Sequence, residues 1–418
     1  MPELIVVGAG IVGLSCAWSA QRRGWQVTLI DRDFEGDRAS HGNAGGIGVS
    51  ECIPLSLKGQ GLKPLKWLLD PLGPLAVRAS HLPRLLPWFL ALRKVAEPGN
   101  HLRIARALAA LNDRSLADFE AMLSDIGLRG DLHQRGALTV YETRKAFAKD
   151  SAEWQLKRRL GVRWRAVDSQ ELQTLEPGLA PLFAQAVMLE DWAHVNDPKR
   201  IVAALRQRVQ SLGAVLVAGA AVSIALDASD RSAVVLADGR CCAGDKVVIA
   251  AGAWSARLAR TVGDHALLES ERGYNTTLPA SATRLQREVI FAERQFVATP
   301  LAIGLRIGGA AEFAGLEAPP NYQRSDALLR LARRYLPGLD ETGAQQWMGH
   351  RPATPDSLPV IGPSARSPRL LYAFGHGHLG LTQSVTTGEL LGEVIAGHKP
   401  SLDLAPYSIT RFRPKAPY

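Results

Sequence analysis

Residues 4–17 of the chain read LIVVGAGIVGLSCA, and residues 27–31 read VTLID. The first stretch is a short apolar strand that runs directly into three glycines, Gly8, Gly10 and Gly13, at G-x-G-x-x-G spacing. The first glycine allows a tight turn, the second lets a pyrophosphate approach the backbone, and the third lets helix and strand pack closely. Phosphate groups are favoured at the start of the following helix, where free N–H groups and the helix dipole attract negative charge.

The second strand ends in Asp31, which is placed to accept hydrogen bonds from a ribose. Glycines at this spacing also occur in ordinary turns, so the signal lies in the complete order of strand, turn, helix, strand and acid. That order predicts a Rossmann-like α/β fold with a dinucleotide site at the N-terminus.

Length and composition describe an ordinary globular protein. The chain has 418 residues, enough for two or three domains, with 46% hydrophobic and 21% charged residues. Lys and Arg outnumber Asp and Glu by 49 to 40, but they are scattered and form no basic tail, so we expect no nucleic-acid partner. No apolar run approaches the roughly 18 residues of a membrane span. The chain begins at once with a strand, so we expect no signal peptide and a cytoplasmic location.

The four cysteines show no metal-binding pattern. Cys16, Cys52, Cys241 and Cys242 have no C-x-x-C or histidine-paired spacing, so we expect neither a metal site nor a disulfide framework.

Periodicity and capping residues predict the remaining elements. Apolar residues at three- and four-residue intervals predict helical sequence over about 101–127, and Asp197-Pro198 is typical of a helix start. Asp238-Gly239 predicts a hairpin turn. Further expected elements are a helix ending near 157, strands at 136–141, 214–217, 246–254 and 369–374, short strands and turns over 274–313, and helices at 325–335 and about 381–396.

Four further stretches resemble a known family: Ser40-His-Gly-Asn43-Ala-Gly45-Gly46, Val248-Ile-Ala-Ala-Gly252-Ala-Trp-Ser, Gly349-His-Arg351-Pro through Gly362, and Phe374-Gly-His376-Gly-His378-Leu-Gly-Leu. With the N-terminal glycines, they resemble the D-amino-acid oxidase-like FAD-dependent oxidoreductases. Within these, the chain is most similar to the bacterial D-amino-acid dehydrogenases of the small-subunit type. The likeness runs in order along nearly the whole chain.

The resemblance implies a Rossmann-like FAD-binding domain interleaved with a substrate or cap domain built on an antiparallel sheet. We expect the FAD-binding domain to comprise residues 1–50, 168–265 and 345–418. The substrate domain would comprise residues 51–167 and 266–344.

The resemblance also implies a set of FAD contacts. The small residues from Ser40 to Gly46 would let backbone N–H groups approach the flavin or pyrophosphate, although a plain surface turn is the alternative. The last helix would point its N-terminus at the flavin pyrimidine edge, where negative charge develops on reduction. The expected cofactor-binding residues are Gly8, Gly10, Ile11, Val12, Gly13, Asp31, Arg32, Ser40, Asn43, Ala44, Gly45, Gly46, Val222, Ala251, Gly252, Trp254, Gly377, His378, Leu379, Gly380, Leu381 and Thr382.

Three residues are expected to carry catalysis: Arg351, Tyr274 and His378. In the family, the arginine of the matching G-x-R-P element binds the substrate carboxylate, and a planar guanidinium can pair with a carboxylate through two bonds. A structural salt bridge is the alternative for Arg351. Tyr274 would bind the carboxylate or amine, or else pack; His378 would supply a second polar contact, or else be structural.

Two further residues are expected to have structural roles, and one stretch departs from the family pattern. His376 would support the glycine-rich loop, and Arg306, between apolar neighbours, is interpreted as a solvated or bridging strand charge. Glu51-Cys-Ile-Pro54 departs from the tyrosine- and alanine-rich loop expected of the dehydrogenases. That loop shapes the side-chain pocket, so substrate preference cannot be carried over.

The resemblance implies oxidative deamination of D-amino acids to imino acids, which hydrolyse to 2-oxo acids, by hydride transfer from Cα to N5 of non-covalently bound FAD. Orientation would do most of the work, and the sequence shows no evident protein base. One alternative is a dehydrogenase of a cyclic imino acid such as D-proline or cis-4-hydroxy-D-proline. Another is a non-catalytic flavin subunit of a larger oxidase.

The electron acceptor is expected to be a quinone or another acceptor than oxygen. The segment 55–95 mixes basic residues with Leu, Trp67, Trp88 and Phe89, and its prolines prevent it from spanning a bilayer. Such a segment can lie in an anionic membrane interface, or can form short helices with a solvated basic face. The resemblance decides between these two possibilities, because the bacterial dehydrogenases that the chain resembles pass electrons to the membrane quinone pool. It therefore implies peripheral contact with the cytoplasmic face of the inner membrane.

Overall fold

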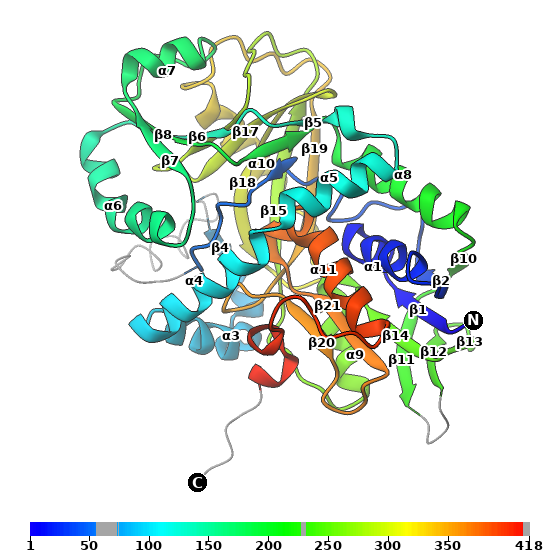
Figure 1. Ribbon diagram of the computed structural model, residues 1–418. Helices are drawn as coiled ribbons and strands as arrows, with labels where there is room; N and C mark the ends of the chain where they lie inside the picture. The colour runs from blue at the N-terminus through cyan, green and yellow to red at the C-terminus, as the bar shows by residue number, and fades with distance from the viewer. Residues whose placement is uncertain (56–72, 74, 227–230, 413–418) are drawn as a thin grey trace.

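The structure is a computed structural model that describes residues 1–55, 73, 75–226 and 231–412 (Figure 1). Two large sheets and a layer of helices organise these residues. We call them the parallel sheet and the mixed sheet.

Among the described residues, the parallel sheet has the strand order β10-β2-β1-β14-β21-β20. Its first five strands are parallel, and β20 runs antiparallel to β21. The central strands are apolar and buried, as expected of strands covered on both faces. The bounds are β1 Glu3–Val7, β2 Gln26–Asp31, β10 Val215–Ala218, β14 Lys246–Ile249, β20 Val360–Pro363 and β21 Leu370–Phe374.

Close backbone approach at glycines fixes the first helices of this layer. A Cβ on Gly13 would lie 1.9 Å from the carbonyl oxygen of Gly8, so only glycine fits where α1 (Ile11–Gln21) leaves β1. A Cβ on Gly388 would lie 2.5 Å from the Ser15 carbonyl oxygen, which brings α11 (Gly380–Ile395) onto α1. The N-terminal and C-terminal segments of the chain therefore share one core.

The mixed sheet has the order β19-β15-β18-β17-β16-β6-β8-β7 in the described part of the chain, and β4 pairs with β18. The β16–β6 and β18–β4 pairs are parallel and the other pairs are antiparallel. The bounds are β4 Leu75–Val77, β6 Ala137–Tyr141, β7 Trp164–Val167, β8 Gln185–Leu189, β15 Glu269–Leu278, β16 Glu288–Phe291, β17 Phe296–Leu301, β18 Gly304–Phe313 and β19 Gln345–Ala353.

Two smaller sheets and the remaining helices complete the described residues. The small sheets are β11-β12-β13 and β3-β9-β5. Their bounds are β3 Gly46–Ile47, β5 Leu132–His133, β9 Ala193–Val195, β11 Ala221–Leu226, β12 Ser232–Leu236 and β13 Cys241–Gly244. The α-helices are α3 Leu82–Val95, α4 Pro98–Asn112, α5 Ser115–Asp125, α6 Arg144–Arg159, α7 Ser169–Leu175, α8 Pro198–Ser211, α9 Ser255–Thr261 and α10 Gln323–Ala332. Short 3-10 helices lie at Ala79–His81, Arg129–Asp131, Gly252–Trp254, Gly377–Leu379, Ala405–Tyr407 and Ile409–Phe412.

Most expected elements are present, including α8 after Asp197 and the hairpin turn at Asp238-Gly239. The helical sequence expected over 101–127 is present as two helices, α4 and α5, because the chain turns at Asp113–Arg114 so that both pack against α11. One expectation was wrong. The stretch 274–313 contains the ten-residue strands β15 and β18 rather than only short ones, because both strands are largely buried along their length.

Strand pairing bears on the expected domain division. β8 pairs in the mixed sheet, as does β19, although residues 168–265 and 345–418 were assigned to the FAD-binding part. The chain thus crosses between the two large sheets more often than the sequence suggests. The division itself stays a prediction.

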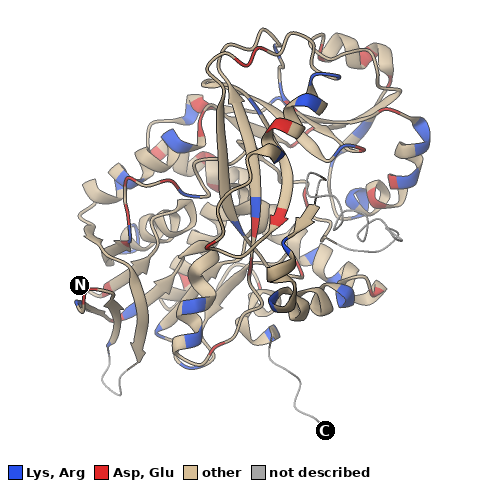
Figure 2. Cartoon of the chain, turned by 180° about the vertical axis from the view of Figure 1, so that it is seen from behind, with Lys and Arg blue, Asp and Glu red and all other residues tan. Residues whose placement is uncertain are grey.

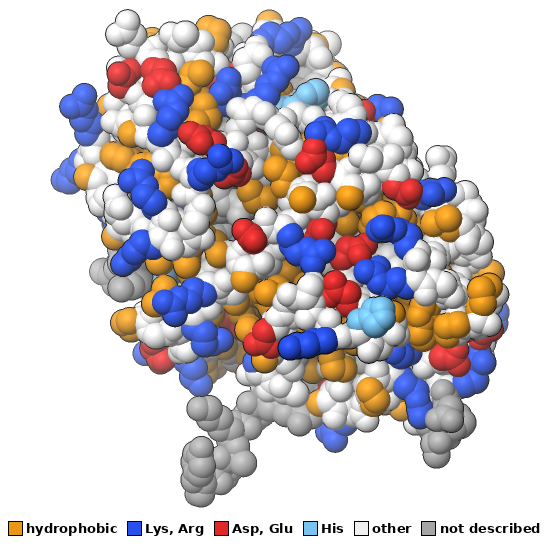
Figure 3. All heavy atoms as spheres, in the orientation of Figure 1, with side chains coloured by type: hydrophobic (Ala, Val, Ile, Leu, Met, Phe, Trp, Pro, Cys, Tyr) orange, Lys and Arg blue, Asp and Glu red, His pale blue; other side chains and the backbone are white. Residues whose placement is uncertain are grey.

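Charged side chains are distributed over the surface rather than gathered. Figure 2 shows basic and acidic residues interspersed on one side of the molecule, and Figure 3 shows both signs mixed on the opposite side. Among the described residues, no helix is long and apolar enough to cross a membrane. No group of His, Cys, Asp and Glu in the same residues could hold a metal ion.

Candidate active site

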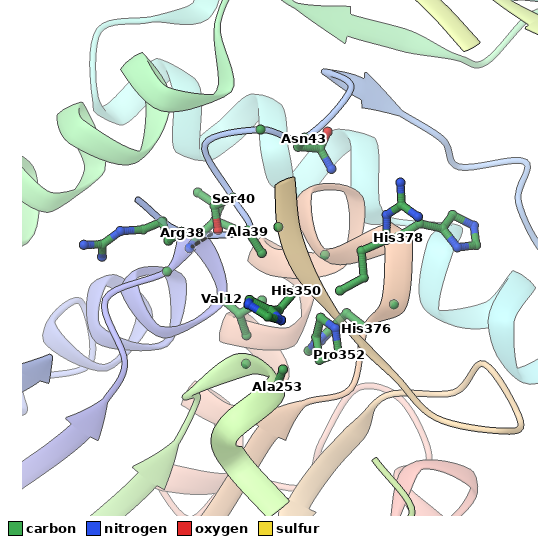
Figure 4. Close-up of a pocket in the computed structure, with 18 of the residues that line it drawn as sticks. Val12, Arg38, Ala39, Ser40, Asn43, Ala253, His350, Pro352, His376 and His378 are labelled. Atoms are coloured by element: carbon green, nitrogen blue, oxygen red, sulfur yellow. Dashed lines mark hydrogen bonds between the residues drawn. The ribbon is translucent and has the colours of Figure 1, made fainter. Parts of the chain in front are cut away.

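A cavity of about 1380 Å³ is lined by residues from both large sheets (Figure 4). Binding pockets for single small molecules measure roughly 300–1000 Å³, so this cavity has room for more than one such ligand. All of the residues expected to contact FAD line it except Gly13 and Gly45, and the three expected catalytic residues line it too. The sequence motifs therefore converge on one space.

The glycine turn forms one end of the cavity. Gly8 has a φ of +109°, and a Cβ there would lie 2.4 Å from the Ala250 carbonyl oxygen. At Gly10 an added Cβ would instead meet only the Ser40 hydroxyl, at 3.4 Å. The backbone N–H of Ile11, the first residue of α1, donates to Ser40 Oγ at 3.0 Å. Helix start, Gly10 and Ser40 thus border an open site of the kind that binds phosphate groups.

Asp31 and Arg38 fix this turn from behind. Asp31 Oδ2 accepts a hydrogen bond from the Ala9 backbone N–H at 2.6 Å, and Arg38 Nη1 donates to the Ala9 carbonyl at 2.6 Å. Arg38 also lies 3.6 Å from Asp31 Oδ2. Asp31 therefore supports the turn directly, as does Arg38, for which the sequence offered no signal. Figure 4 shows Arg38, Ala39 and Ser40 together at this end.

Another part of the cavity wall is aromatic and basic. The Arg32 guanidinium lies over the Trp254 ring at 4.0 Å, and Trp254 meets His350 edge-on at 5.2 Å. Val222, on β11, is 49% exposed and lines the cavity. Burial lowers the pKa of His350 to about 4, so its ring is neutral at physiological pH.

The Ser40–Gly46 loop is held by two side chains from the mixed sheet. Arg306 Nη1 donates to the carbonyl of Asn43 at 2.6 Å and to that of His41 at 3.4 Å, and Asn275 Nδ2 donates to the carbonyl of Gly42 at 2.7 Å. Arg306 is 6% exposed, and burial lowers its pKa to about 10. The interpretation of Arg306 as a solvated charge was wrong, whereas the bridging alternative describes it. The apolar neighbours of Arg306 on its strand were the feature of the sequence from which its burial could have been predicted.

The start of α11 and the turn before it form a further part of the cavity wall. Gly375 and Gly377 have φ values of +86° and +53°, which bring the chain into the turn that precedes α11. Thr382 Oγ1 accepts a hydrogen bond from the Gly48 N–H at 2.9 Å and so joins α11 to the segment after the loop. His376 Nε2 lies 3.0 Å from Thr387 Oγ1, and burial lowers the His376 pKa to about 3. This neutral, buried ring supports the turn, while His378 is exposed and lines the cavity.

Arg351 lies across a neighbouring strand. A Cβ on Gly273 would come within 2.3 Å of Arg351 Cζ, so this glycine makes the space for the guanidinium. Arg351 Nη1 donates to Glu271 Oε1 at 2.8 Å, and 29% of its side chain is exposed. The structure therefore contains the salt bridge that was the alternative for Arg351. A guanidinium carries five donor hydrogens, so one ion pair leaves others for an anion in the cavity.

Tyr274 is placed differently from the expectation. Its hydroxyl donates to Glu312 Oε2 at 2.5 Å and accepts from the Asn321 N–H at 3.0 Å, and the residue is 1% exposed. Burial raises the pKa of this phenol. Tyr274 lines the cavity, but its hydroxyl hydrogen is already committed to Glu312.

Two carboxylates that were not expected from the sequence also line the cavity. Glu51 lines the cavity and accepts a hydrogen bond from Lys157 Nζ at 2.9 Å. Burial acts to raise the pKa of Glu51, but the charges of Lys157 and His378 outweigh it, so the pKa is lowered. Glu288 also lines the cavity and is 3% exposed. Its strand, Glu288-Val-Ile-Phe, carries no motif that would single it out.

Comparison with known proteins gives consistent results. The family model described as FAD dependent oxidoreductase (DAO) matches residues 3–394. A D-amino-acid oxidase of Bradyrhizobium diazoefficiens is 36% identical over 99% of this chain and 100% of the relative, and a D-amino acid dehydrogenase of Rhizobium johnstonii is 28% identical over 98% and 100%. Among solved structures, glycine oxidase from Geobacillus kaustophilus has a TM-score of 0.75 at 23% identity, covering 99% of this chain and 100% of the other. L-proline dehydrogenase from P. horikoshii has a TM-score of 0.76 at 18% identity, covering 98% and 97%. At these identities the two structures show the fold alone.

Proposed function

The chain belongs to the FAD-dependent oxidoreductase family, and we propose that it dehydrogenates D-amino acids to imino acids, which hydrolyse to 2-oxo acids. The FAD dependence and the general amino-acid oxidoreductase activity follow from the family and its curated members. The choice of D-amino acids is our proposal, supported by the names of the two relatives that match over their full length.

The observation that carries the proposal is the convergence of three features on one cavity. These are the open glycine turn at the start of α1, the start of α11 and the guanidinium of Arg351. The turn fits a dinucleotide, because Gly10 leaves backbone space that a side chain would fill. FAD, when bound, supplies the acceptor for a hydride from the substrate Cα.

Substrate orientation would then depend on the chain's own residues. Arg351 would pair with the substrate carboxylate, while Glu271 holds the guanidinium in place. His378, exposed at the start of α11, would add a polar contact. With the Tyr274 hydroxyl bonded to Glu312, that residue would shape the wall of the cavity rather than bind the carboxylate. Fixing the substrate in this way lowers the entropy cost of reaching the reactive geometry.

We propose a quinone or another membrane-linked carrier as the electron acceptor, with peripheral contact at a membrane surface. Part of the segment behind this proposal, residues 56–72 and 74, lies outside the described residues. The support comes from α3, whose Leu82, Leu86 and Leu90 lie one turn apart and are 46%, 55% and 51% exposed. The same helix carries exposed Arg84, Arg93 and Lys94 and no acidic residue. An exposed leucine stripe beside basic residues is typical of helices that lie in anionic membrane interfaces. Oxygen is the second candidate acceptor, favoured by the name of the Bradyrhizobium relative.

Anaerobic mixing of the purified yellow enzyme with D-alanine, D-proline and cis-4-hydroxy-D-proline tests the reaction. Bleaching by D-alanine supports open-chain substrates, and faster bleaching by the cyclic compounds would favour the imino-acid alternative. Flavin that stays oxidised with these compounds and with a panel of all other amino acids would favour a non-catalytic flavin subunit. Under air, dye reduction faster than oxygen uptake supports a dehydrogenase, and the reverse would make the enzyme an oxidase.

A further inference from the structure

Glu288 is a buried carboxyl that touches the backbone of the Ser40–Gly46 loop. It opens β16 in the interior of the mixed sheet, is 3% exposed and lines the cavity. A Cβ on Gly46 would lie 2.2 Å from Glu288 Oε2 and 3.0 Å from Trp192 Nε1. Gly46 is therefore the residue that lets this carboxyl approach the loop.

The hydrogen bonds of this carboxyl are incomplete. Glu288 Oε2, Trp192 Nε1 and Thr299 Oγ1 are enclosed, and none of the three forms a well-shaped hydrogen bond within the described residues. Trp192 and Thr299 nevertheless face the carboxyl, and both act to stabilise its charged form. A buried polar atom without a full partner costs about 1–3 kcal/mol, so the position of this carboxyl requires an explanation.

No cation compensates Glu288 in the part of the chain that the structure describes. Glu176, another buried carboxylate, differs in this respect, because it accepts hydrogen bonds from Arg287 Nε at 2.9 Å and from the Gln286 N–H at 2.9 Å. The charged group whose field reaches Glu288 is Glu51, which repels it and is itself bound to Lys157. His194, on the strand that pairs with β3, is neutral because burial lowers its pKa to about 4.

Burial accordingly raises the pKa of Glu288 to about 7, with Glu51 adding to the rise and Trp192 and Thr299 opposing it. An ordinary glutamate, with a pKa near 4.5, is a weak base toward an α-ammonium group, which titrates at about 8 or above. A carboxyl with a pKa close to the working pH is better matched to this proton transfer.

We propose that Glu288 is the proton acceptor of the site and takes the proton of the substrate α-ammonium group before hydride transfer. In this step an N–H bond of the ammonium breaks and an O–H bond forms on Glu288. R–CH(NH3⁺)–COO⁻ and the Glu288 carboxylate become R–CH(NH2)–COO⁻ and the Glu288 carboxylic acid, and no electrons move. The inference rests on the proposed amino-acid dehydrogenation and adds the base that the sequence did not reveal.

A binding experiment tests the proposal without any redox step. 2-Aminoisobutyrate carries the ammonium and carboxylate but no Cα–H bond, so it can bind and cannot be oxidised; isobutyrate lacks the ammonium group. Dissociation constants for both are measured by calorimetry on the FAD-loaded enzyme. We expect the preference for 2-aminoisobutyrate over isobutyrate to rise about tenfold between about pH 5.5 and about pH 8.5, as Glu288 becomes charged.

E288Q, which keeps the shape and removes the charge, should abolish this rise. E293Q is the matched control, because Glu293 lies exposed at the β16–β17 turn and bonds the Glu142 N–H and Thr143. An unchanged pH dependence in E288Q would overturn the proposal.

Rates of anaerobic flavin reduction by D-alanine give a second readout that does not depend on the binding of 2-aminoisobutyrate. The rate should rise with pH through a midpoint near 7, and W192F, which removes a donor that stabilises the carboxylate, should move the midpoint upward. A midpoint that stays in place in both W192F and E288Q would overturn the role of Glu288. Absence of reduction by every D-amino acid would instead refute the proposed function, so the two failures are distinguishable.

Discussion

Arg351 illustrates how single residues in this site are held in place by partners. Its guanidinium already binds Glu271 at 2.8 Å and lies over Gly273, which fixes its plane before any ligand enters. Tyr274 is fixed in the same way by Glu312, but there the bond uses the only hydroxyl hydrogen. Both residues were expected to bind substrate, Arg351 more firmly than Tyr274, and their partners, which the sequence pattern does not show, distinguish the two.

Replacing Arg351 by Lys keeps the charge but removes the planar fork. We expect kcat/KM to fall at least about a hundredfold, equivalent to roughly 3 kcal/mol, with FAD still bound. The exposed Arg366, which bonds the Gly263 carbonyl, gives the control variant R366K, and its activity should not change. Steady-state kinetics with retained flavin absorbance measure this, and an R351K enzyme within about threefold of wild type would exclude Arg351 as the carboxylate-binding residue.

Glu288 should also make stability depend on pH. Its pKa in the folded protein, about 7, lies above the ordinary value of 4.5, so its contribution to stability is complete below about pH 4.5 and is lost as pH rises through 7. E288Q should therefore match wild type near pH 4 and exceed it near pH 8, by up to about 3 kcal/mol. Thermal unfolding at both pH values measures the difference, and equal shifts in Tm at the two pH values would contradict a raised pKa.

Among the elements, the β1–α1 turn and the start of α11 were the most predictable. Gly8 and Gly13 of the turn are required because a side chain there would lie 1.9–2.4 Å from backbone atoms, and Gly375 and Gly377 before α11 are favoured because their φ values are positive. Such requirements leave a spacing of glycines in the sequence. The α4–α5 break, Arg38 and Glu288 left no comparable pattern, because each depends on residues distant in the chain. Arg306 is an intermediate case. Its burial could have been predicted from its apolar strand neighbours, but its bonds to the Ser40–Gly46 loop could not.

Gly10 tests the glycine turn because it is the one position there that the fold itself does not constrain tightly. Its φ of −73° suits any residue, and an added Cβ meets only Ser40 Oγ at 3.4 Å. G10V should therefore fold but lose FAD, because the side chain occupies the space for the pyrophosphate. Absorbance and circular dichroism should show a colourless, folded protein, and G99A, at an open glycine in α4, should stay yellow. Retention of one FAD per chain in G10V would argue against this site.

At the scale of the whole molecule, the two large sheets border the cavity and α3 presents an apolar stripe to the outside. Leu85, Trp88 and Leu92 bury the opposite face of α3, so the exposed leucines are not needed for its packing. The stripe is visible only in the structure, because leucines lie on both the buried and the exposed face of α3.

Charge on this stripe should abolish membrane binding. We expect wild type to float with anionic liposomes at low salt and less at high salt, and the double variant L86E/L90E to stay unbound. L212E, which changes an exposed leucine after α8, is the control and should float like wild type. Equal flotation of both variants would remove α3 from the interface, and absence of wild-type binding at low salt would remove membrane contact altogether.

The most direct test of the central claim compares enantiomers. The FAD-loaded enzyme is mixed anaerobically with D-alanine and, separately, with L-alanine, and the bleaching of the flavin is followed in a stopped-flow instrument. If the enzyme dehydrogenates D-amino acids, the D-enantiomer should reduce the flavin at least about a hundredfold faster, because only one enantiomer presents its Cα–H to the flavin while its carboxylate binds Arg351. Faster reduction by L-alanine, or no reduction by either enantiomer or by any other D-amino acid, would contradict the assignment.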